Sequence, residues 1–201
     1  MATETELKYR VGDLQLLDCI LCDSSIRAAM REPFSYIKMQ TTYYDTEDEL
    51  LASNRQMLRL RTENDTSVVC FKTPAENGVR GEWECESAYL DEALETLIQK
   101  GAPDVLKTVK ADALLPVCGA EFTRIFARLC PEDGLVIEVC GDIGTLTGNG
   151  HRQELCELEL ELKEGTIAQL QAFGSTLSER YHLKAEPKSK QERARALSRK
   201  K

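Results

Sequence analysis

The segment LCELELELKE, residues 155–164, alternates glutamate with leucine at every second position. Both residue types favour helices, but strict alternation over five or more residues is typical of a β-strand. The period therefore predicts a strand with one leucine face and one face that carries Glu157, Glu159 and Glu161. The leucine face needs an apolar cover. The glutamate face needs cations, because neighbouring carboxylates repel one another.

Six further segments alternate in the same way, and each has a charged face. They are residues 4–11, 57–63, 67–72, 79–86, 121–129 and 135–142. The turn-forming sequences TENDTS, PAENG, PEDG and TGNG separate several of them. Short connections between consecutive strands predict mostly antiparallel pairing. Helical patterns occur at about 13–30, 91–101, 166–180 and 188–199, with Asp13, Asp91 and Thr166 placed to cap the first three.

The length of 201 residues, of which 42% are hydrophobic, suffices for one globular domain. No apolar run approaches the roughly 20 residues of a membrane-spanning helix, and the N-terminal segment lacks the apolar core of a secretion signal. We therefore expect a cytoplasmic protein with no membrane partner. The eight cysteines are scattered, which favours reduced, buried thiols. With two histidines and one isolated CxxC pair, a metal site built on histidine or cysteine is not expected.

The net charge of −8 conceals an asymmetry. Residues 188–201 carry seven lysines and arginines and one glutamate, whereas the rest of the chain is strongly acidic. A basic tail can bind nucleic acid, but this one has no aromatic residues for base stacking. We therefore expect no nucleic-acid partner and a basic helix that docks on an acidic body, with Lys188 and Arg193 at its surface.

The charged strand faces allow two arrangements. An open antiparallel sheet could turn them to water, which is the commoner arrangement. Alternatively, the sheet could close and turn them inward beneath an outer layer of helices. The charges are segregated by strand, and most of the cations are arginines, which suit bidentate binding of phosphate or carboxylate. Periodicity alone leaves both arrangements open.

Clustered carboxylates without histidine suit a hard cation such as Mg²⁺ or Mn²⁺. Alternate residues of a strand lie about 6.5–7 Å apart, so the pairs Glu4–Glu6 and Glu157–Glu159 could hold such an ion. Cations on other strands could neutralise a polyphosphate, while the metal prepares a water molecule for attack. The chain has no GxxxxGK[ST] motif, which excludes P-loop chemistry.

In order along the chain, these segments resemble the motifs of the CYTH superfamily, the triphosphate tunnel metalloenzymes. The motifs are ETELK (4–8), TYYDTEDELL (42–51), LRLR (58–61), FKTP with RGEWE (71–84), FTRIFARL (122–129), CELELELKEG (156–165) and PKSKQERA (187–194). A single ExExK is a weak signal, but the motifs together cover nearly the whole chain. The late glutamate strand is most similar to that of the inorganic triphosphatase branch.

The resemblance implies an α+β fold: a closed eight-stranded antiparallel β-barrel that forms a hydrophilic tunnel, with helices packed outside. It implies one domain over residues 1–201, with the basic helix at about 188–199. The metal ligands that it implies are Glu4, Glu6, Glu157, Glu159 and Glu161. The residues that it implies at the substrate are Lys8, Arg59, Arg61, Lys72, Arg80, Glu82, Arg124, Glu138 and Lys190. The residues that it implies for catalysis are Glu4, Glu6, Lys8, Glu157 and Glu159.

The resemblance also implies metal-dependent hydrolysis of a triphosphate with Mg²⁺ or Mn²⁺. No nucleoside-recognition element is evident in the sequence, so we expect tripolyphosphate, which would be split into pyrophosphate and phosphate. Class IV adenylate cyclases and thiamine or nucleoside triphosphatases belong to the same superfamily and stay as alternatives. A module that binds phosphorylated ligands without turnover is the non-enzymatic alternative. Family members are often dimers, so a homodimer is a further expectation.

Overall fold

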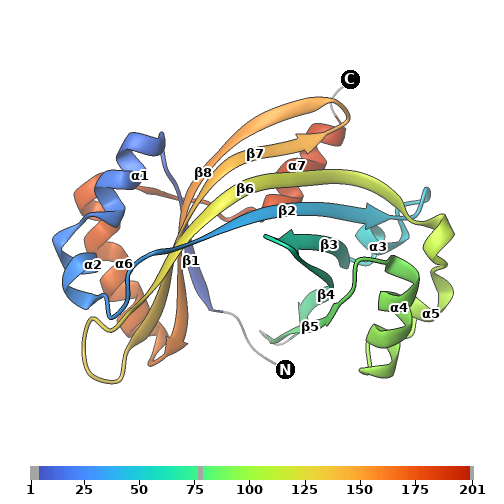
Figure 1. The fold of residues 1–201 in the computed structure, drawn as a ribbon, viewed down its shortest axis with the longest axis horizontal. Coiled ribbons are helices and arrows are strands. Elements are labelled where there is room, and N and C mark those ends of the chain that lie inside the picture. Colours follow the sequence, from blue (N-terminus) through green and yellow to red (C-terminus); the bar gives the residue numbers. More distant parts are fainter. Residues whose placement is uncertain (1–4, 77–78, 200–201) are drawn as a thin grey trace.

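The computed structural model describes residues 5–76 and 79–199, and it describes side chains outside residues 75–80. In this part of the chain, nine strands form one antiparallel sheet in the order β5-β4-β3-β2-β6-β7-β8-β1-β9 (Figure 1). The strands are β1 (Glu6–Arg10), β2 (Ser35–Asp45), β3 (Met57–Glu63), β4 (Thr66–Glu76), β5 (Val79–Glu86), β6 (Leu115–Leu129), β7 (Val136–Gly148), β8 (His151–Glu164) and β9 (Lys184–Ala185).

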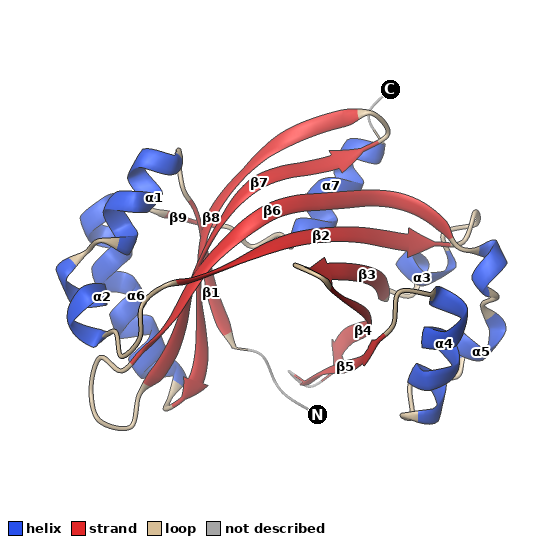
Figure 2. Cartoon of the chain, viewed as in Figure 1, coloured by secondary structure: helices blue, strands red, loops and turns tan. Residues whose placement is uncertain are grey.

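Seven α-helices and one 3-10 helix accompany the sheet in the described residues (Figure 2). They are α1 (Leu14–Leu21), α2 (Ser24–Ala29), α3 (Leu50–Ser53), α4 (Leu90–Gln99), α5 (Val105–Thr108), η1 (Ala111–Ala113), α6 (Ile167–Tyr181) and α7 (Lys190–Ser198). Each segment predicted from alternation lies within a strand or overlaps one. β2 was not predicted as a strand, and β9 was not expected from the sequence.

The expected closed eight-stranded barrel is wrong. Among the described strands, β5 pairs only with β4, whereas β1 pairs with β8 on one edge and with β9 on the other. The backbone N–H of Glu186, which follows β9, donates to the carbonyl of Lys8. A closed barrel would need β1 to pair with β5, but β9 and Glu186 already occupy that edge of β1. The sheet is open, and its strands arch over α7 (Figure 1).

Two groups of helices cover the apolar face of the sheet. Helices α1, α2 and α6 cover the apolar face of β1, β6, β7 and β8, where Leu158 and Leu160 are fully buried. Helices α3, α4 and α5 cover the same face of β3, β4 and β5 around Leu58 and Phe71. The charged face is thereby left on the inner, concave side.

Helix α7 corrects the expectation that all helices pack outside. It lies on the concave side, where Ala194 and Leu197 pack against Phe122 of β6 and Leu155 of β8. The basic segment does dock on an acidic body, as predicted, because its arginines and Lys190 form ion pairs with carboxylates of the sheet.

Helix caps explain where several helices begin. Asp13 caps α1, and Thr166 forms a capping box at the start of α6, both as predicted. The single helix predicted over 13–30 is instead two helices, because Asp23 caps a second helix by accepting from the backbone N–H of Ser25. Asp91 is not a cap: it lies in the first turn of α4, whose N-cap residue is Tyr89.

All eight cysteines are free thiols. Cys70, Cys85, Cys118 and Cys140 are buried, as expected, but Cys19 of α1 and Cys22, the C-cap residue of that helix, are exposed. In the described ranges, no helix has the length and apolarity that a membrane crossing needs.

Candidate active site

The register of three neighbouring strands builds a band of acidic side chains on the concave face. β1 places Lys8 opposite Glu159 of β8. β7 places Asp142 opposite Glu157 of β8. Glu138, Glu161 and Glu6 lie in line across the same three strands, since Glu161 pairs with both of its neighbours. Strand parity therefore gathers these groups on one face, as the alternation predicted.

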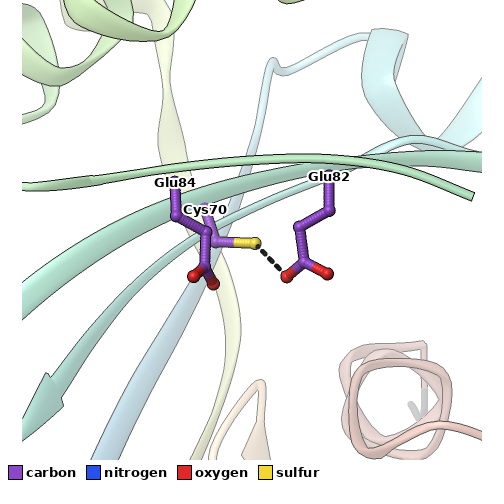
Figure 3. A group of neighbouring side chains, drawn as sticks. All are labelled: Cys70, Glu82 and Glu84. Atoms are coloured by element: carbon purple, nitrogen blue, oxygen red, sulfur yellow. Dashed lines mark hydrogen bonds between the residues drawn. The ribbon is translucent and has the colours of Figure 1, made fainter. Parts of the chain in front are cut away.

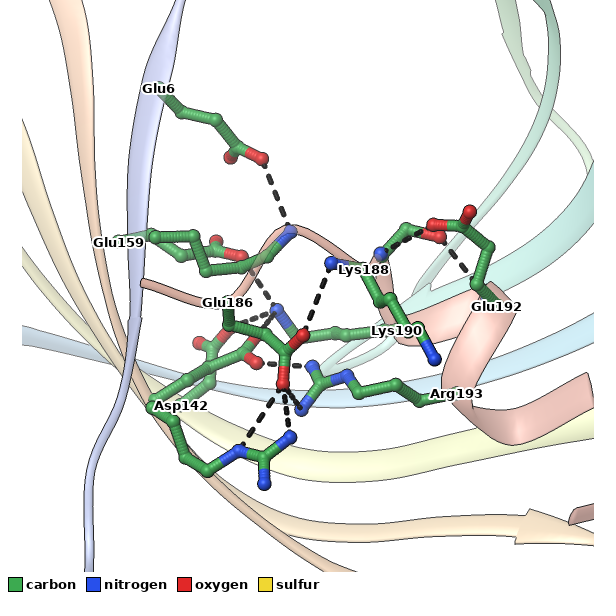
Figure 4. A network of polar contacts seen from close by, with 12 residues as sticks. Glu6, Asp142, Glu159, Glu186, Lys188, Lys190, Glu192 and Arg193 are labelled. Carbon is green, nitrogen blue, oxygen red and sulfur yellow. Dashed lines mark hydrogen bonds and ion pairs between the residues drawn. The ribbon is translucent and has the colours of Figure 1, made fainter. Parts of the chain in front are cut away.

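At the centre of this band, Lys190 of α7 meets three carboxylates, here called the carboxylate cluster: Asp142, Glu157 and Glu159 (Figure 4). Its Nζ lies 2.7 Å from Asp142 Oδ2 and 2.8 Å from Glu159 Oε1, and it also contacts Glu157. One carboxylate oxygen from each residue lies within 4.8 Å of the others. The Lys190 side chain is 11% exposed, and the Asp142 and Glu157 side chains are fully buried.

Two arginines complete the charge balance of the cluster. Arg124 of β6 donates to both oxygens of Asp142, at 2.8 and 2.7 Å, and its Nη2 also lies 2.5 Å from Glu159 Oε2. Arg193 of α7 contacts Glu157. The cluster thus carries three negative charges and touches three cations. A buried carboxylate is tolerated only when it is paired in this way.

The two buried glutamates differ in their electrostatic surroundings. Burial raises the pKa of Glu157 above its usual value, and the attraction of Lys190 offsets this in part. Burial would likewise raise the pKa of Glu159, but Lys190 and Arg124 outweigh it and lower the pKa to about 2. Burial lowers the pKa of Lys190, but the cluster outweighs this and raises it above its ordinary range. Lys190 and Glu159 are therefore both charged at neutral pH.

The sequence around residue 189 explains why α7 begins at the cluster. Ser189 and Glu192 form a capping box that starts the helix at Lys190. Residues three apart share a helix face, so Lys190 and Arg193 both point at the sheet. The buried Glu186 accepts from Arg10 and from the backbone N–H of Lys188, which fixes the segment that leads into the helix (Figure 4).

At the rim of the cluster, β1 contributes Glu6 and Lys8. The Lys8 side chain is 9% exposed and its Nζ lies 3.4 Å from Glu6 Oε1, whereas the Glu6 side chain is 41% exposed. A cavity of about 300 Å³ opens beside them and is also lined by Glu186 and Pro187. Glu4, the other predicted ligand of this strand, lies outside the described residues.

A second charged group lies on β3, β4 and β5. The Nζ of Lys72 lies 2.8 Å from Glu82 Oε1, and Arg59 Nη2 lies 3.6 Å from Glu84 Oε1. The Cys70 thiol donates to Glu82 at 3.2 Å (Figure 3). Burial raises the pKa of the Cys70 thiol, which is therefore protonated at neutral pH. Figure 3 shows both carboxylates reaching the same side of the sheet.

The remaining predicted residues are spread over the same face. Arg61 pairs with Glu63 within β3. Glu138 and Glu161 share Lys163, whose Nζ lies 3.4 and 2.7 Å from them. Arg80 belongs to β5, but its side chain lies outside the described part.

Sequence reasoning missed two residues of the site. Asp142 ends the alternating segment 135–142 but was not among the predicted site residues, although it is fully buried between Arg124 and Lys190. Arg193 was expected at the surface, yet its side chain is 7% exposed against Glu157. Arg193 follows Lys190 by three residues, and this spacing indicates that both side chains share the helix face that contacts the sheet.

A scan of known families matches the CYTH domain over residues 2–194. The chain belongs to the CYTH domain family. Over 138 residues, this CYTH chain is 28% identical to an inorganic triphosphatase of Haemophilus influenzae. The alignment covers 68% of this chain and 39% of that protein, so the chain spans well under half the length of its curated relative.

Solved structures share the CYTH fold with this chain. A protein from Hippeastrum, described as a candidate adenylyl cyclase with a dominant triphosphatase activity, superposes with a TM-score of 0.60 at 17% identity. The superposition covers 96% of this chain and 95% of that one. A candidate adenylate cyclase from Bacillus halodurans gives a TM-score of 0.59 at 16% identity and covers 92% and 93% of the two chains. At these identities the likeness shows the fold.

The acidic groups of this CYTH domain could hold a metal ion. The carboxylate cluster offers hard oxygen donors, which suit a hard divalent cation. The ammonium of Lys190 already lies at hydrogen-bond distance from these oxygens, so a cation fits between them. The group of Cys70, Glu82 and Glu84 also brings three potential ligand atoms within 4.8 Å, but its thiol is protonated and its carboxylates are paired.

Proposed function

We propose that this chain hydrolyses inorganic triphosphate to pyrophosphate and phosphate with the help of a divalent metal ion. One observation carries the proposal: a single concave face bears both a carboxylate cluster that holds a cation and arginines and lysines from β3, β4 and β6. A linear triphosphate needs both, since its charge must be offset while a phosphoryl group is transferred. The similarity to the Haemophilus influenzae inorganic triphosphatase supports this choice of substrate.

The metal that we propose is Mg²⁺ or Mn²⁺, because oxygen ligands without histidine suit these ions. When bound, such an ion supplies Lewis acidity toward phosphate oxygens and lowers the pKa of water. The buried Asp142 offers an additional oxygen to the set. The residues that we propose as ligands from the family motifs are Glu4, Glu6, Glu157, Glu159 and Glu161.

The protein's own cations bind and orient the substrate in this proposal. The residues that contact phosphate oxygens are Lys8, Arg59, Arg61, Lys72, Arg80, Arg124 and Lys190. Glu82 and Glu138 hold neighbouring lysines, as Glu82 holds Lys72. A water molecule attacks the terminal phosphorus in line, and the bond to the bridging oxygen breaks. Pyrophosphate leaves with its new charge offset by the cations, and a carboxylate of the face accepts the proton of the water.

A substrate panel tests this function. Tripolyphosphate, ATP, thiamine triphosphate and pyrophosphate are each incubated with Mg²⁺ or Mn²⁺, and both phosphate and cyclic AMP are measured. We expect phosphate release from tripolyphosphate to exceed that from all other substrates and to stop with EDTA. Dominant formation of cyclic AMP or dominant hydrolysis of thiamine triphosphate would show that tripolyphosphate is not the preferred substrate. Tight binding of tripolyphosphate without turnover would favour a binding module.

A pair of variants on one strand tests the site. Glu157→Gln removes a charge from the carboxylate cluster, and we expect it to abolish phosphate release. Glu154→Gln makes the same chemical change three residues earlier on β8, at an exposed position on the opposite face. We expect Glu154→Gln to keep full activity. Equal activities of the two variants would contradict the proposed role of the cluster.

A further inference from the structure

The ammonium of Lys190 lies in the position that a metal ion would take. Its Nζ is 2.7 Å from Asp142 and 2.8 Å from Glu159, and it contacts Glu157 as well. Figure 4 shows the Lys190 side chain reaching toward Asp142 and Glu159. A divalent ion that used the same three oxygens would have no room for the ammonium beside it. Lysine and metal are therefore alternative occupants of one site.

The charge of the site changes when a metal ion replaces Lys190 among the carboxylates. The carboxylate cluster is neutralised by Lys190, Arg124 and Arg193, so an added divalent ion would leave the site with an excess of two positive charges. Unbalanced charges in a buried site are costly. A polyanion that arrives with the ion would remove this excess and would also offer new partners for the displaced ammonium.

The structure lets Lys190 move without moving its helix. Lys190 is the first residue of α7, so its long side chain leaves the helix at an end. The rest of α7 is held separately, because Arg195 pairs with Asp45 at 2.9 Å and Leu197 is buried against the sheet. The Nζ also lies 5.3 Å from the centre of the Phe122 ring, a favourable contact that does not depend on the carboxylates.

We propose that Lys190 is a built-in counter-ion that occupies the metal position until a divalent ion displaces it, and that the freed ammonium then binds the anionic ligand. The inference rests on the proposed metal site. It makes Lys190 a competitor of the metal in the empty site and a phosphate-binding group in the filled one. Metal and polyphosphate then strengthen each other's binding, because coupling between two ligands is reciprocal.

The test measures metal binding without substrate. Mn²⁺ is titrated into the wild type, Lys190→Met and Lys188→Met, and free Mn²⁺ is followed by electron paramagnetic resonance. Lys188 is exposed and two residues away, so Lys188→Met changes the net charge equally without touching the cluster. We expect Lys190→Met to bind Mn²⁺ about 10-fold more tightly than the wild type, a typical size for site coupling. Lys188→Met should match the wild type.

Thermal unfolding gives a second readout. Without metal, Lys190→Met should unfold at a lower temperature than the wild type, because the cluster lacks a counter-ion, and Mn²⁺ should raise its Tm by more than that of the wild type. Lys190→Gln keeps a hydrogen-bond donor at this position and serves for the same comparison if the methionine variant does not fold.

The outcomes separate this inference from the proposed function. Unchanged or weaker Mn²⁺ binding by the Lys190 variants, with Mn²⁺ bound by the wild type, would overturn the inference and leave the metal site standing. Failure of the wild type and all variants to bind Mn²⁺ would overturn both the inference and the proposed metal site.

Discussion

Replacing Arg193 by methionine tests whether buried charge holds α7 on the sheet. The Arg193 guanidinium contacts the Glu157 carboxylate, and the two side chains are 7% and 0% exposed. Methionine keeps much of the apolar stem but removes the charge, so Glu157 stays buried with one cation fewer. We expect the free energy of unfolding to fall, by an amount that depends on pH.

The loss of unfolding free energy depends on whether Glu157 stays charged or binds a proton. Breaking a buried ion pair typically costs about 3–5 kcal/mol. Glu157 can escape part of this cost by binding a proton. Each pH unit above the ordinary glutamate pKa of 4.5 makes that protonation about 1.36 kcal/mol more costly. Protonation therefore limits the loss to about 3.4 kcal/mol at pH 7 and to about 0.7 kcal/mol at pH 5.

The sign of the pH dependence can be checked independently. A carboxyl whose folded-state pKa is raised above the unfolded value costs nothing below the unfolded pKa, and its cost grows as pH rises toward the folded pKa. Urea unfolding of the wild type and Arg193→Met at pH 5, 6, 7 and 8 measures this growth. Arg199→Met is the matched control at the C-cap of the same helix, because Arg199 pairs with Glu49 in solvent and should matter little.

Two results would refute this reasoning. One is a loss at pH 7 no larger than the loss at pH 5. The other is an Arg193 variant that is as stable as the Arg199 control throughout. The double variant Arg193→Met with Glu157→Gln should regain much of the stability at pH 7, because no unpaired buried carboxylate remains.

Three further perturbations test the site and the sheet. Glu159→Gln should abolish phosphate release, while far-UV circular dichroism should still show strands. In the wild type, burial raises the pKa of Glu159, but Lys190 and Arg124 outweigh it and lower the pKa to about 2. The wild type's stability advantage over this variant, measured in urea, should therefore be constant above pH 4.5 and shrink toward pH 2. Arg59→Ala should raise the KM for tripolyphosphate about 10-fold, whereas the exposed Lys107→Ala should not change it. Gly144→Ala should lower stability by about 3 kcal/mol in thermal unfolding, since its Cβ would lie 2.1 Å from the Glu121 carbonyl oxygen; an unchanged Tm would contradict this strand spacing.

The strands were predictable where charge alternates and not elsewhere. Residues 57–63 alternate arginine with leucine, and they form β3 with the predicted bounds. β2, with the sequence SYIKMQTTYYD, has no repeating charge and was missed as a strand. Alternation identifies the face of a side chain but not the neighbour of a strand. The sheet stays open because β9 pairs with the outer edge of β1, and β9 has only two residues, which is too short to leave a pattern in the sequence.

The site was predictable to the level of a face. Parity placed Glu157 and Glu159 on one face of their strand, and Glu6 and Lys8 on one face of theirs, because the strand period is two. The sequence could not predict which cation pairs with each carboxylate, because this depends on the register of β7 with β8 and on the docking of α7. Arg193 shows the difference: its spacing from Lys190 is visible in the sequence, but its burial arises only from the packing of α7 against the sheet.

Strand parity also separates the mutations that this domain can tolerate. Along β8, Leu158 and Leu160 belong to the apolar core, whereas Glu157 and Glu159 belong to the charged face. A scan of single substitutions should show alternating phenotypes along β8, with loss of expression at one residue and loss of turnover at the next. Deleting one residue inside β8 would turn leucines toward Lys190 and glutamates into the core. Changes in length should therefore accumulate in the hairpin turns, while substitutions on the charged face can alter the chemistry without changing the core.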